Sequence, residues 1–306
     1  MKTKIIQAVI FVMFLSLIFN SSIITEELKY ALNTFLWILF PSIFPFFLIG
    51  DLLIEYNFVH TLNKLLSKIT EKIFHVTSAS SFVILMSMVS GFPSGAKYIK
   101  NLYDKNMLTI NQANYLITFT HFANPLFVLT VTESIFNNFN ISIYILISMY
   151  LSNIFIGIIT RPKIIDETTK MELNKVPNFS KALSSSIRSS IDLLIIILGN
   201  TCFFFLVTRL LSTYINFNPF IEILINGFFD ITKGIQSIST LSSTILFKGI
   251  LVLTFICFGG INIHMQVKNI IADTKISYKN FLLGRICQIA FSIVIFIFIL
   301  TFQGIY

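Results

Sequence analysis

Side chains able to do chemistry are sparse in this chain, and most of them gather in four short segments. Two segments combine glycine with small polar residues, and the other two interrupt long apolar stretches. The four segments are Ser90–Lys97, Asn124–Pro125, Asp230–Gly234 and Gly259–Gln266. Because metalloprotease, serine-hydrolase and phosphate-loop patterns do not occur, we expect binding at these segments and no enzyme activity.

Metal and cofactor chemistry has little support either. The cysteines Cys202, Cys257 and Cys287 stand singly in apolar stretches, and the histidines are scattered along the chain. Zinc sites require closely spaced ligands, such as a C-x-x-C pair, and none is found. The sequence therefore predicts no metal ion and no cofactor.

The first glycine-containing segment is typical of a sharp turn. Gly91, Pro93 and Gly95 let the backbone bend, which would expose amide groups and the Ser94 hydroxyl to a polar or anionic ligand at a helix N-terminus. A bend with a purely structural role explains the same residues. Lys97 is costly at membrane depth unless it is paired or hydrated, which favours a functional role, although a lysine can also extend toward the membrane surface.

The two interrupting segments are predicted breaks in membrane helices. Pro125 removes a backbone donor, and Asn124 supplies an amide that can both donate and accept. Gly260 marks the second break, where polar residues then follow at alternate positions and cannot all share one helix face. These residues are Asn262, His264 and Gln266. Substrate contact and simple kinks both remain open for the two breaks.

Charged residues in the remaining segment allow two interpretations. Asp230 and Lys233 are spaced i, i+3, so they form either a compensated ion pair or, with Thr232 and Gly234, a substrate contact. Three further carboxylates near the inner ends of predicted crossings leave a similar choice between proton coupling and simple solvation: Asp51, Glu55 and Asp192.

Composition requires a lipid environment around these segments. Apolar residues make up 55% of the chain, charged residues only 12%, and the mean hydropathy is +0.82. A soluble domain of 306 residues could not cover such a core with polar surface. The net charge of +8 is spread over loops, which argues against nucleic-acid binding. We expect an all-α integral membrane protein whose partner is the lipid bilayer.

Hydropathy predicts seven crossings and two re-entrant hairpins. The stretches Val76–Ser90 and Ile221–Phe229 are too short to cross, and each is followed by a turn and a polar helical run, as expected for hairpins. The predicted crossings are residues 5–24, 31–54, 109–136, 140–160, 182–211, 244–267 and 280–302.

Charge asymmetry favours this topology with the N-terminus inside. Of the 22 lysines and arginines, 17 then fall in cytoplasmic segments, including Arg285, and 3 fall outside. The remaining two, Lys97 and Lys233, lie at the hairpin tips. Residues 1–30 are predicted to be an uncleaved signal anchor, because no small-x-small cleavage site follows the apolar stretch.

The same topology contains an internal repeat. Residues 31–160 and 182–306 follow the same order of crossing, hairpin, interrupted crossing and final crossing, in opposite orientations, and residues 161–181 form a polar cytoplasmic linker. Inverted repeats with paired broken helices are a transporter architecture, in which the binding site lies near the midplane.

Several motifs resemble one protein family. The matching pieces are Phe40–Phe47 (FPSIFPFF), Ser90–Lys97 (SGFPSGAK), Asn124–Phe127 (NPLF), Tyr150–Asn153 (YLSN), Asp230–Gly234 (DITKG) and Phe258–Val267 (FGGINIHMQV). Together they resemble the YlbJ family of sporulation integral membrane proteins, which carry the nucleoside recognition or Gate module. This resemblance implies a role in endospore formation at the cortex stage, in the forespore or mother-cell membrane. His121-Phe-Ala and Asp230 depart from the residues expected at their positions.

Together these observations predict a permease for a small polar solute. The alternative is a non-transporting scaffold or assembly factor in cortex formation, and a homo-oligomer remains open. The predicted substrate-binding residues come from both hairpins and both breaks: Gly91, Pro93, Ser94, Gly95, Lys97, Asn124, Pro125, Asp230, Thr232, Gly234, Gly260, His264 and Gln266.

Overall fold

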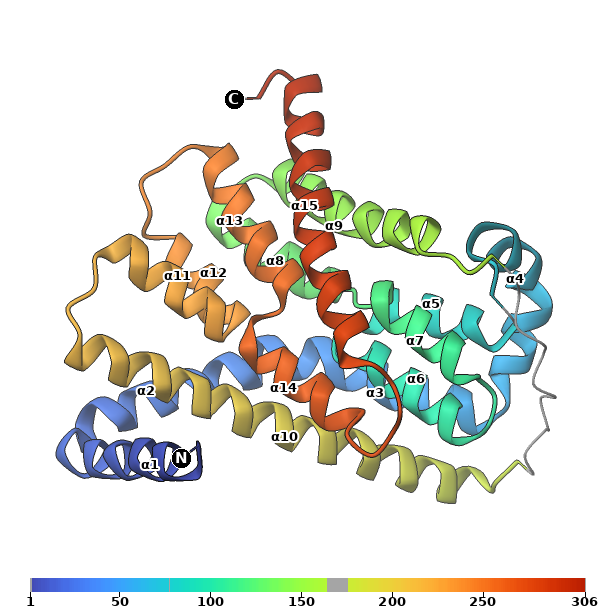
Figure 1. Ribbon diagram of the computed structural model, residues 1–306, viewed down its shortest axis with the longest axis horizontal. Helices are drawn as coiled ribbons and strands as arrows, with labels where there is room; N and C mark the ends of the chain where they lie inside the picture. The colour runs from blue at the N-terminus through green and yellow to red at the C-terminus, as the bar shows by residue number, and fades with distance from the viewer. Residues whose placement is uncertain (1, 77, 164–175, 306) are drawn as a thin grey trace.

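The computed structural model describes residues 2–76, 78–163 and 176–305. Within these ranges every regular element is helical, with fifteen α-helices and one π-helical segment (Figure 1). The predicted all-α class is therefore confirmed. Most of the predicted linker, residues 164–175, lies outside the described residues.

The chain begins with a short apolar helix and then a long one. Helix α1 spans Lys2–Phe19, and α2 (Ser21–Thr34) continues through the π-helical segment η1 (Phe35–Leu39) into α3 (Phe40–Glu55). The predicted crossing at 5–24 is thus divided at Asn20, which separates α1 from α2. The π segment directly precedes Pro41 and Pro45, whose missing N–H groups disturb the ordinary α-helical bonding pattern.

Three helices then form the first hairpin region. Helix α4 (Phe58–Phe74) ends at His75 in the left-handed conformation, and α5 (Ser78–Ser90) leads to α6 (Ser94–Asp104). The second half of α4 and helix α5 meet at an angle of 88°. Helix α4 was not expected from hydropathy, because it is amphipathic rather than continuously apolar.

The first predicted interruption is clearly visible in the structure. Helix α7 (Ile110–Phe119) starts with a capping box between Thr109 and Gln112 and ends at Thr120. Non-helical backbone follows, and Asn124 caps α8 (Pro125–Phe136), where proline at the first position costs no hydrogen bond. Helix α9 (Phe139–Ile159) completes this half.

Six helices follow between residues 179 and 302. Helix α10 (Phe179–Tyr214) is followed by α11 (Pro219–Phe229) and the short α12 (Ile231–Ile238). Helices α13 (Ile245–Phe258) and α14 (Gly260–Ile270) are separated only by Gly259. Helix α15 (Tyr278–Phe302) closes the chain.

Two groups of three helices hold the molecule together. Helix α15 packs against α9 and α13, while α10 packs along α2 and α3 on the opposite side of the molecule (Figure 1). A separate apolar cluster between α3 and α10 contains Phe35, Ile43, Phe47, Leu194 and Ile197. The hairpins and breaks lie between these two packed layers.

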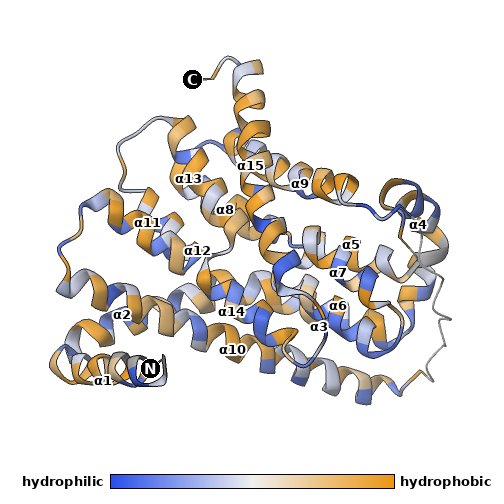
Figure 2. Cartoon of the chain, viewed as in Figure 1, coloured by the Kyte–Doolittle hydropathy of each residue, from blue (hydrophilic) through white to orange (hydrophobic). Residues whose placement is uncertain are grey.

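The surface suits a bilayer. Large apolar side chains are exposed, including Trp37 at 78% and Phe302 at 81%, which water would disfavour. Hydrophobic residues cover much of α11, α13 and α15, whereas hydrophilic residues gather around α4 and the start of α10 (Figure 2). Among the described residues, five helices are long and apolar enough to cross a membrane, or six if the bent pair counts as one span. The protein is a multi-pass membrane protein, and the count of seven crossings stays a prediction.

Candidate functional site

A small cavity lies where the two hairpins meet the two helix breaks. Its volume is about 40 Å³, enough for roughly three water molecules. Residues from η1, α3, both hairpins, both breaks and α10 line it, and about half of them are apolar. The polar or turn-forming lining residues are Ser42, Pro93, Asn124, Thr201, Asp230, Thr232, Asn262 and Gln266.

The first hairpin tip contacts the first break through a glycine. Gly91 has φ of +77°, and a Cβ there would lie 2.4 Å from the backbone nitrogen of Asn124. Both the left-handed conformation and the close approach require glycine. The Ser94 hydroxyl donates to the Gly91 carbonyl, so it stabilises the turn. Of these tip residues, only Pro93 lines the cavity together with Phe92.

Asn124 connects the first break to its surroundings. Its Oδ1 accepts from the backbone N–H groups of Leu126 and Phe127, which caps α8. Its Nδ2 donates to the carbonyls of Ser42 and Val89, each at 3.0 Å. Both amide hydrogens and the amide oxygen are therefore used inside the protein, between α3, α5 and α8.

The second hairpin tip also has a capping side chain, the carboxylate of Asp230. Asp230 is 3% exposed, and its Oδ1 accepts from the backbone N–H groups of Thr232 at 2.8 Å and Lys233 at 3.2 Å. Its Oδ2 accepts from Asn262 Nδ2 at 2.6 Å. Asp230 therefore caps α12 and joins the second tip to the second break.

The second break is short. Gly259 and Gly260, with φ of +95° and +61°, form it, and α14 runs from Gly260 to Ile270. Asn262 and Gln266 are spaced i, i+4, so they share the face toward the cavity, and Gln266 Nε2 donates to Asn262 Oδ1 at 2.8 Å. The polar residues after the break therefore lie on a helix.

His264 contributes to the packing of α14 on α15. Its Nδ1 and Nε2 are hydrogen-bonded to the Tyr278 hydroxyl at 2.8 Å and the Phe258 carbonyl at 2.9 Å. Its ring also contacts Phe281. His264 does not line the cavity.

Each hairpin carries a lysine paired with a carboxylate from another helix. Lys97 Nζ lies 2.6 Å from Asp51 Oδ2, and the ammonium lies 5.2 Å from the Phe47 ring centroid. Both side chains are only about 10% exposed: 10% for Lys97 and 9% for Asp51. A buried lysine at this depth is thus compensated by charge and by an aromatic face.

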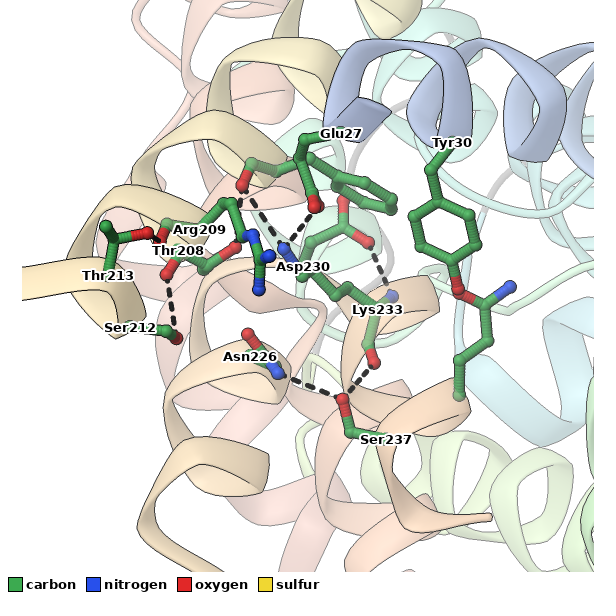
Figure 3. A network of polar contacts seen from close by, with 12 residues as sticks. Glu27, Tyr30, Thr208, Arg209, Ser212, Thr213, Asn226, Asp230, Lys233 and Ser237 are labelled. Carbon is green, nitrogen blue, oxygen red and sulfur yellow. Dashed lines mark hydrogen bonds and ion pairs between the residues drawn. The ribbon is translucent and has the colours of Figure 1, made fainter. Parts of the chain in front are cut away.

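The second lysine does not pair with Asp230, as one interpretation of the i, i+3 spacing expected. Lys233 instead forms an ion pair with Glu27 of α2, lies 5.2 Å from the Phe205 ring centroid and donates to the Phe205 carbonyl (Figure 3). The Ser237 hydroxyl links the Lys233 carbonyl to Asn226, which fastens α12 to α11. No sequence motif marked Glu27, which lies before the first predicted repeat.

Arg285 connects α15 to the first break. It was assigned to a cytoplasmic segment, but it is fully buried in α15. Its guanidinium donates to the carbonyls of Thr118 and His121 and to Asn153 Oδ1. No carboxylate in the described ranges lies within 4.0 Å of it. Arg285 therefore binds the free carbonyls where α7 ends at the first break.

The structure brings only part of the predicted set to the cavity. Five predicted residues line it: Pro93, Asn124, Asp230, Thr232 and Gln266. The others lie outside the lining: Gly91, Ser94, Gly95, Lys97, Pro125, Gly234, Gly260 and His264. Sequence reasoning missed Ser42, although it belongs to the FPSIFPFF motif, and it missed Thr201, which no motif marks. In the described part of the chain, no three His, Cys, Asp or Glu side chains are grouped for a metal ion.

Comparison with known proteins supports the resemblance of the motifs. The chain is 28% identical to the sporulation integral membrane protein YlbJ of Bacillus subtilis (strain 168) over 302 residues, an alignment that covers 86% of this chain and 74% of the relative. This similarity supports assigning the chain to the YlbJ family. No protein-family model and no solved structure matches it.

Proposed function

We propose that the protein is a permease that carries a small polar solute across a membrane of the sporulating cell. Two observations support this proposal. The Bacillus subtilis relative is a sporulation integral membrane protein. The small cavity joins both hairpin tips and both helix breaks, which is the arrangement transporters use for a binding site near the midplane.

The proposed architecture has seven crossings, two re-entrant hairpins and two inverted repeats over residues 31–160 and 182–306. Its support is the pairing of like features in the two halves. In the first, Gly91 of the tip contacts the break at Asn124; in the second, Gly260 of the break contacts the tip, where a Cβ would lie 3.0 Å from the Phe229 carbonyl oxygen. Each hairpin also places one lysine over a phenylalanine ring.

The proposed mechanism is alternating access. A cavity of about 40 Å³ is too small for a solute larger than a few waters, so the described conformation corresponds to a closed state. Movement of either hairpin would enlarge it. The two lysine–carboxylate pairs join the hairpins to α3 and α2, so they are the contacts that opening would break or carry along.

A scaffold without transport activity is the second candidate. The observation that favours it is the internal hydrogen bonding of Asn124, which leaves no amide hydrogen for a ligand. A scaffold would require the polar tips only for packing.

Solute-dependent thermal stabilisation tests the proposal. A ligand that prefers the folded state raises apparent stability in proportion to its saturation. A panel of small polar metabolites is added to the purified protein, and one of them is expected to raise Tm. Thr201→Val should remove that response, whereas Thr240→Val, on the exposed surface, should retain it. If no polar solute raises Tm and none is taken up by proteoliposomes, the scaffold is the better interpretation.

A deletion strain tests the role in sporulation. We expect near-normal vegetative growth and heat-sensitive spores with a defective cortex. Complementation with the wild-type gene restores heat resistance. Complementation with Thr201→Val tests whether heat resistance requires solute binding or only the presence of the protein. Normal heat-resistant spore counts in the deletion strain would contradict the assigned role.

A further inference from the structure

The second half of the cavity contains a buried carboxylate with no cationic partner. Asp230 is the one ionisable side chain among the described residues that line the cavity. No basic side-chain nitrogen of the described ranges lies within 4.0 Å of its carboxylate. The nearest lysine in sequence, Lys233, directs its ammonium to Glu27 instead.

The hydrogen bonds of Asp230 leave part of its capacity unused. An ionised carboxylate offers about four lone-pair positions, and three donors approach it: two backbone N–H groups on Oδ1 and Asn262 Nδ2 on Oδ2. One position therefore remains for a further positive or donating group. Because Asp230 lines the cavity, such a group could reach it from there.

Neutral polar groups lie at the same end of the cavity. Asn262 Nδ2 donates to Asp230 Oδ2 at 2.6 Å and to Thr201 Oγ1 at 3.3 Å, and Asn262 Oδ1 accepts from Gln266 Nε2 at 2.8 Å. Gln266 is 1% exposed, and its Oε1 has no hydrogen-bond partner. A buried amide oxygen without a donor is unfavourable unless a water donates to it or a cation binds it.

We propose that oxygen atoms of Asp230, Thr201 and Gln266 form a site for a sodium ion at the second break, with Asn262 holding Asp230 in position. Hard oxygen ligands without sulfur or imidazole select alkali and alkaline-earth cations. A single carboxylate balances a monovalent charge, whereas calcium sites use several carboxylates. A proton would occupy Asp230 alone and would leave Gln266 Oε1 unpaired.

The site would couple ion binding to hairpin position, a consequence that rests on the proposed transport function. Asp230 belongs to the second tip, whereas Asn262 and Gln266 belong to α14. An ion between them joins the tip to the break, so its release would free the hairpin to move. The sodium gradient would then drive the solute.

The test measures sodium binding by the purified full-length protein without any solute. Radioactive sodium binding is recorded, and Tm is measured in sodium, potassium and choline chloride at equal ionic strength and pH. We expect saturable sodium binding and a rise in Tm specific to sodium. Asp230→Asn and Gln266→Leu should both abolish it.

Matched controls keep the test decisive. Asp192→Asn removes an exposed carboxylate on α10, and Gln303→Leu removes an exposed amide beyond α15, so both should retain the sodium response. If Asp230→Asn fails to fold, Gln266→Leu and Thr201→Val still decide the question. Equal Tm in the three salts, or a sodium response retained by Gln266→Leu, would overturn the proposal.

The outcome is separable from that of the permease hypothesis. Solute uptake that is equal in sodium and choline would support transport and overturn the sodium site. Sodium binding that is lost in Asp230→Asn, in a protein that carries no solute, would support the site while the transport function fails. If Tm responds to pH but not to sodium, and Asp230→Asn removes the pH response, the site binds a proton and the sodium proposal is overturned.

Discussion

The two hairpins compensate their buried lysines from different sources. Lys97 uses Asp51, four residues after Phe47 on α3, the crossing of its own half. Lys233 lies over Phe205 on α10, but the residue four positions later is Arg209, and the carboxylate comes from Glu27 on α2. Helix α2 lies largely before the repeats, so the N-terminal region is part of the second hairpin's structure and more than an anchor.

The capping residues at the cavity also differ between the two halves. Asn124 in the first half is neutral and fully hydrogen-bonded, and Arg285 binds the carbonyls of the adjoining break. Asp230 in the second half is a carboxyl group that three donors approach, so one acceptor position remains open. We infer that internal hydrogen bonds hold the first half of the cavity in place, whereas the second half can still bind a further group.

Breaking the first ion pair should have the largest effect. Asp51→Asn or Lys97→Met leaves one buried charge without its partner, which typically costs about 3–5 kcal/mol. We expect a correspondingly lower unfolding free energy in detergent denaturation. The double variant Asp51→Leu/Lys97→Met should recover most of the loss. If each single variant is as stable as the wild type, the pair does not hold the first hairpin.

In the Lys233–Glu27 pair, the carboxylate can be moved from α2 to α10 by mutation. Glu27→Gln should destabilise the second hairpin by about 2–4 kcal/mol, since it removes one partner of a largely buried pair. Hydrogen exchange should then increase in α12 and remain unchanged in α6. Adding Arg209→Glu should restore protection, because it places a carboxylate where the first half has Asp51. Failure of the rescue, with Glu27→Gln still destabilising, would show that α2 has no substitute on α10.

Exchanging the cap residues should affect the two halves unequally. Asn124→Asp retains the cap of α8 but turns a donor into a carboxylate facing the carbonyls of Ser42 and Val89, which should cost about 1–3 kcal/mol. Asp230→Asn retains a good cap and should cost less than about 1 kcal/mol. Thermal unfolding of both variants measures the difference. Equal losses of stability in the two variants would argue against a first half that is held more firmly than the second.

The smallest effect is expected at a surface contact between the two halves. Lys100 lies 3.0 Å from Asp273 and 2.8 Å from Asp104. Hydrogen bonding to Asp104 and Asp273 raises the pKa of Lys100, and hydrogen bonding to Lys100 lowers the pKa of Asp273. The stabilising contribution of Asp273 is therefore complete at neutral pH and is lost as the pH falls through its lowered pKa, whereas that of Lys100 is lost only at alkaline pH.

Asp273→Asn should consequently leave Tm at pH 7 nearly unchanged, because exposed ion pairs are screened by solvent. Any difference from the wild type should shrink further on acidification. Thermal unfolding at neutral and acidic pH in low and high salt checks both statements. A large, salt-independent loss of Tm would show that this contact joins the halves.

Much of the fold could be predicted from local pattern. The apolar stretches determined the helices α9, α10 and α15, and the Asn124-Pro125 and Gly259-Gly260 pairs located both breaks. Helix α4 was missed because its apolar residues follow an amphipathic period. Five of the predicted binding residues line the cavity, whereas Lys97 and His264 do not. Their roles in binding stay predictions.

The sequence by itself determined that this chain is helical, lies in a membrane and turns at specific glycines, because hydropathy and backbone freedom are properties of neighbouring residues. Only the tertiary structure decided which polar groups meet. Lys233 pairs with Glu27 across 206 positions, and Arg285 binds carbonyls at Thr118 and His121 more than 160 positions away. A buried charge requires a partner wherever the chain can supply one, and no local pattern specifies which distant segment folds against it.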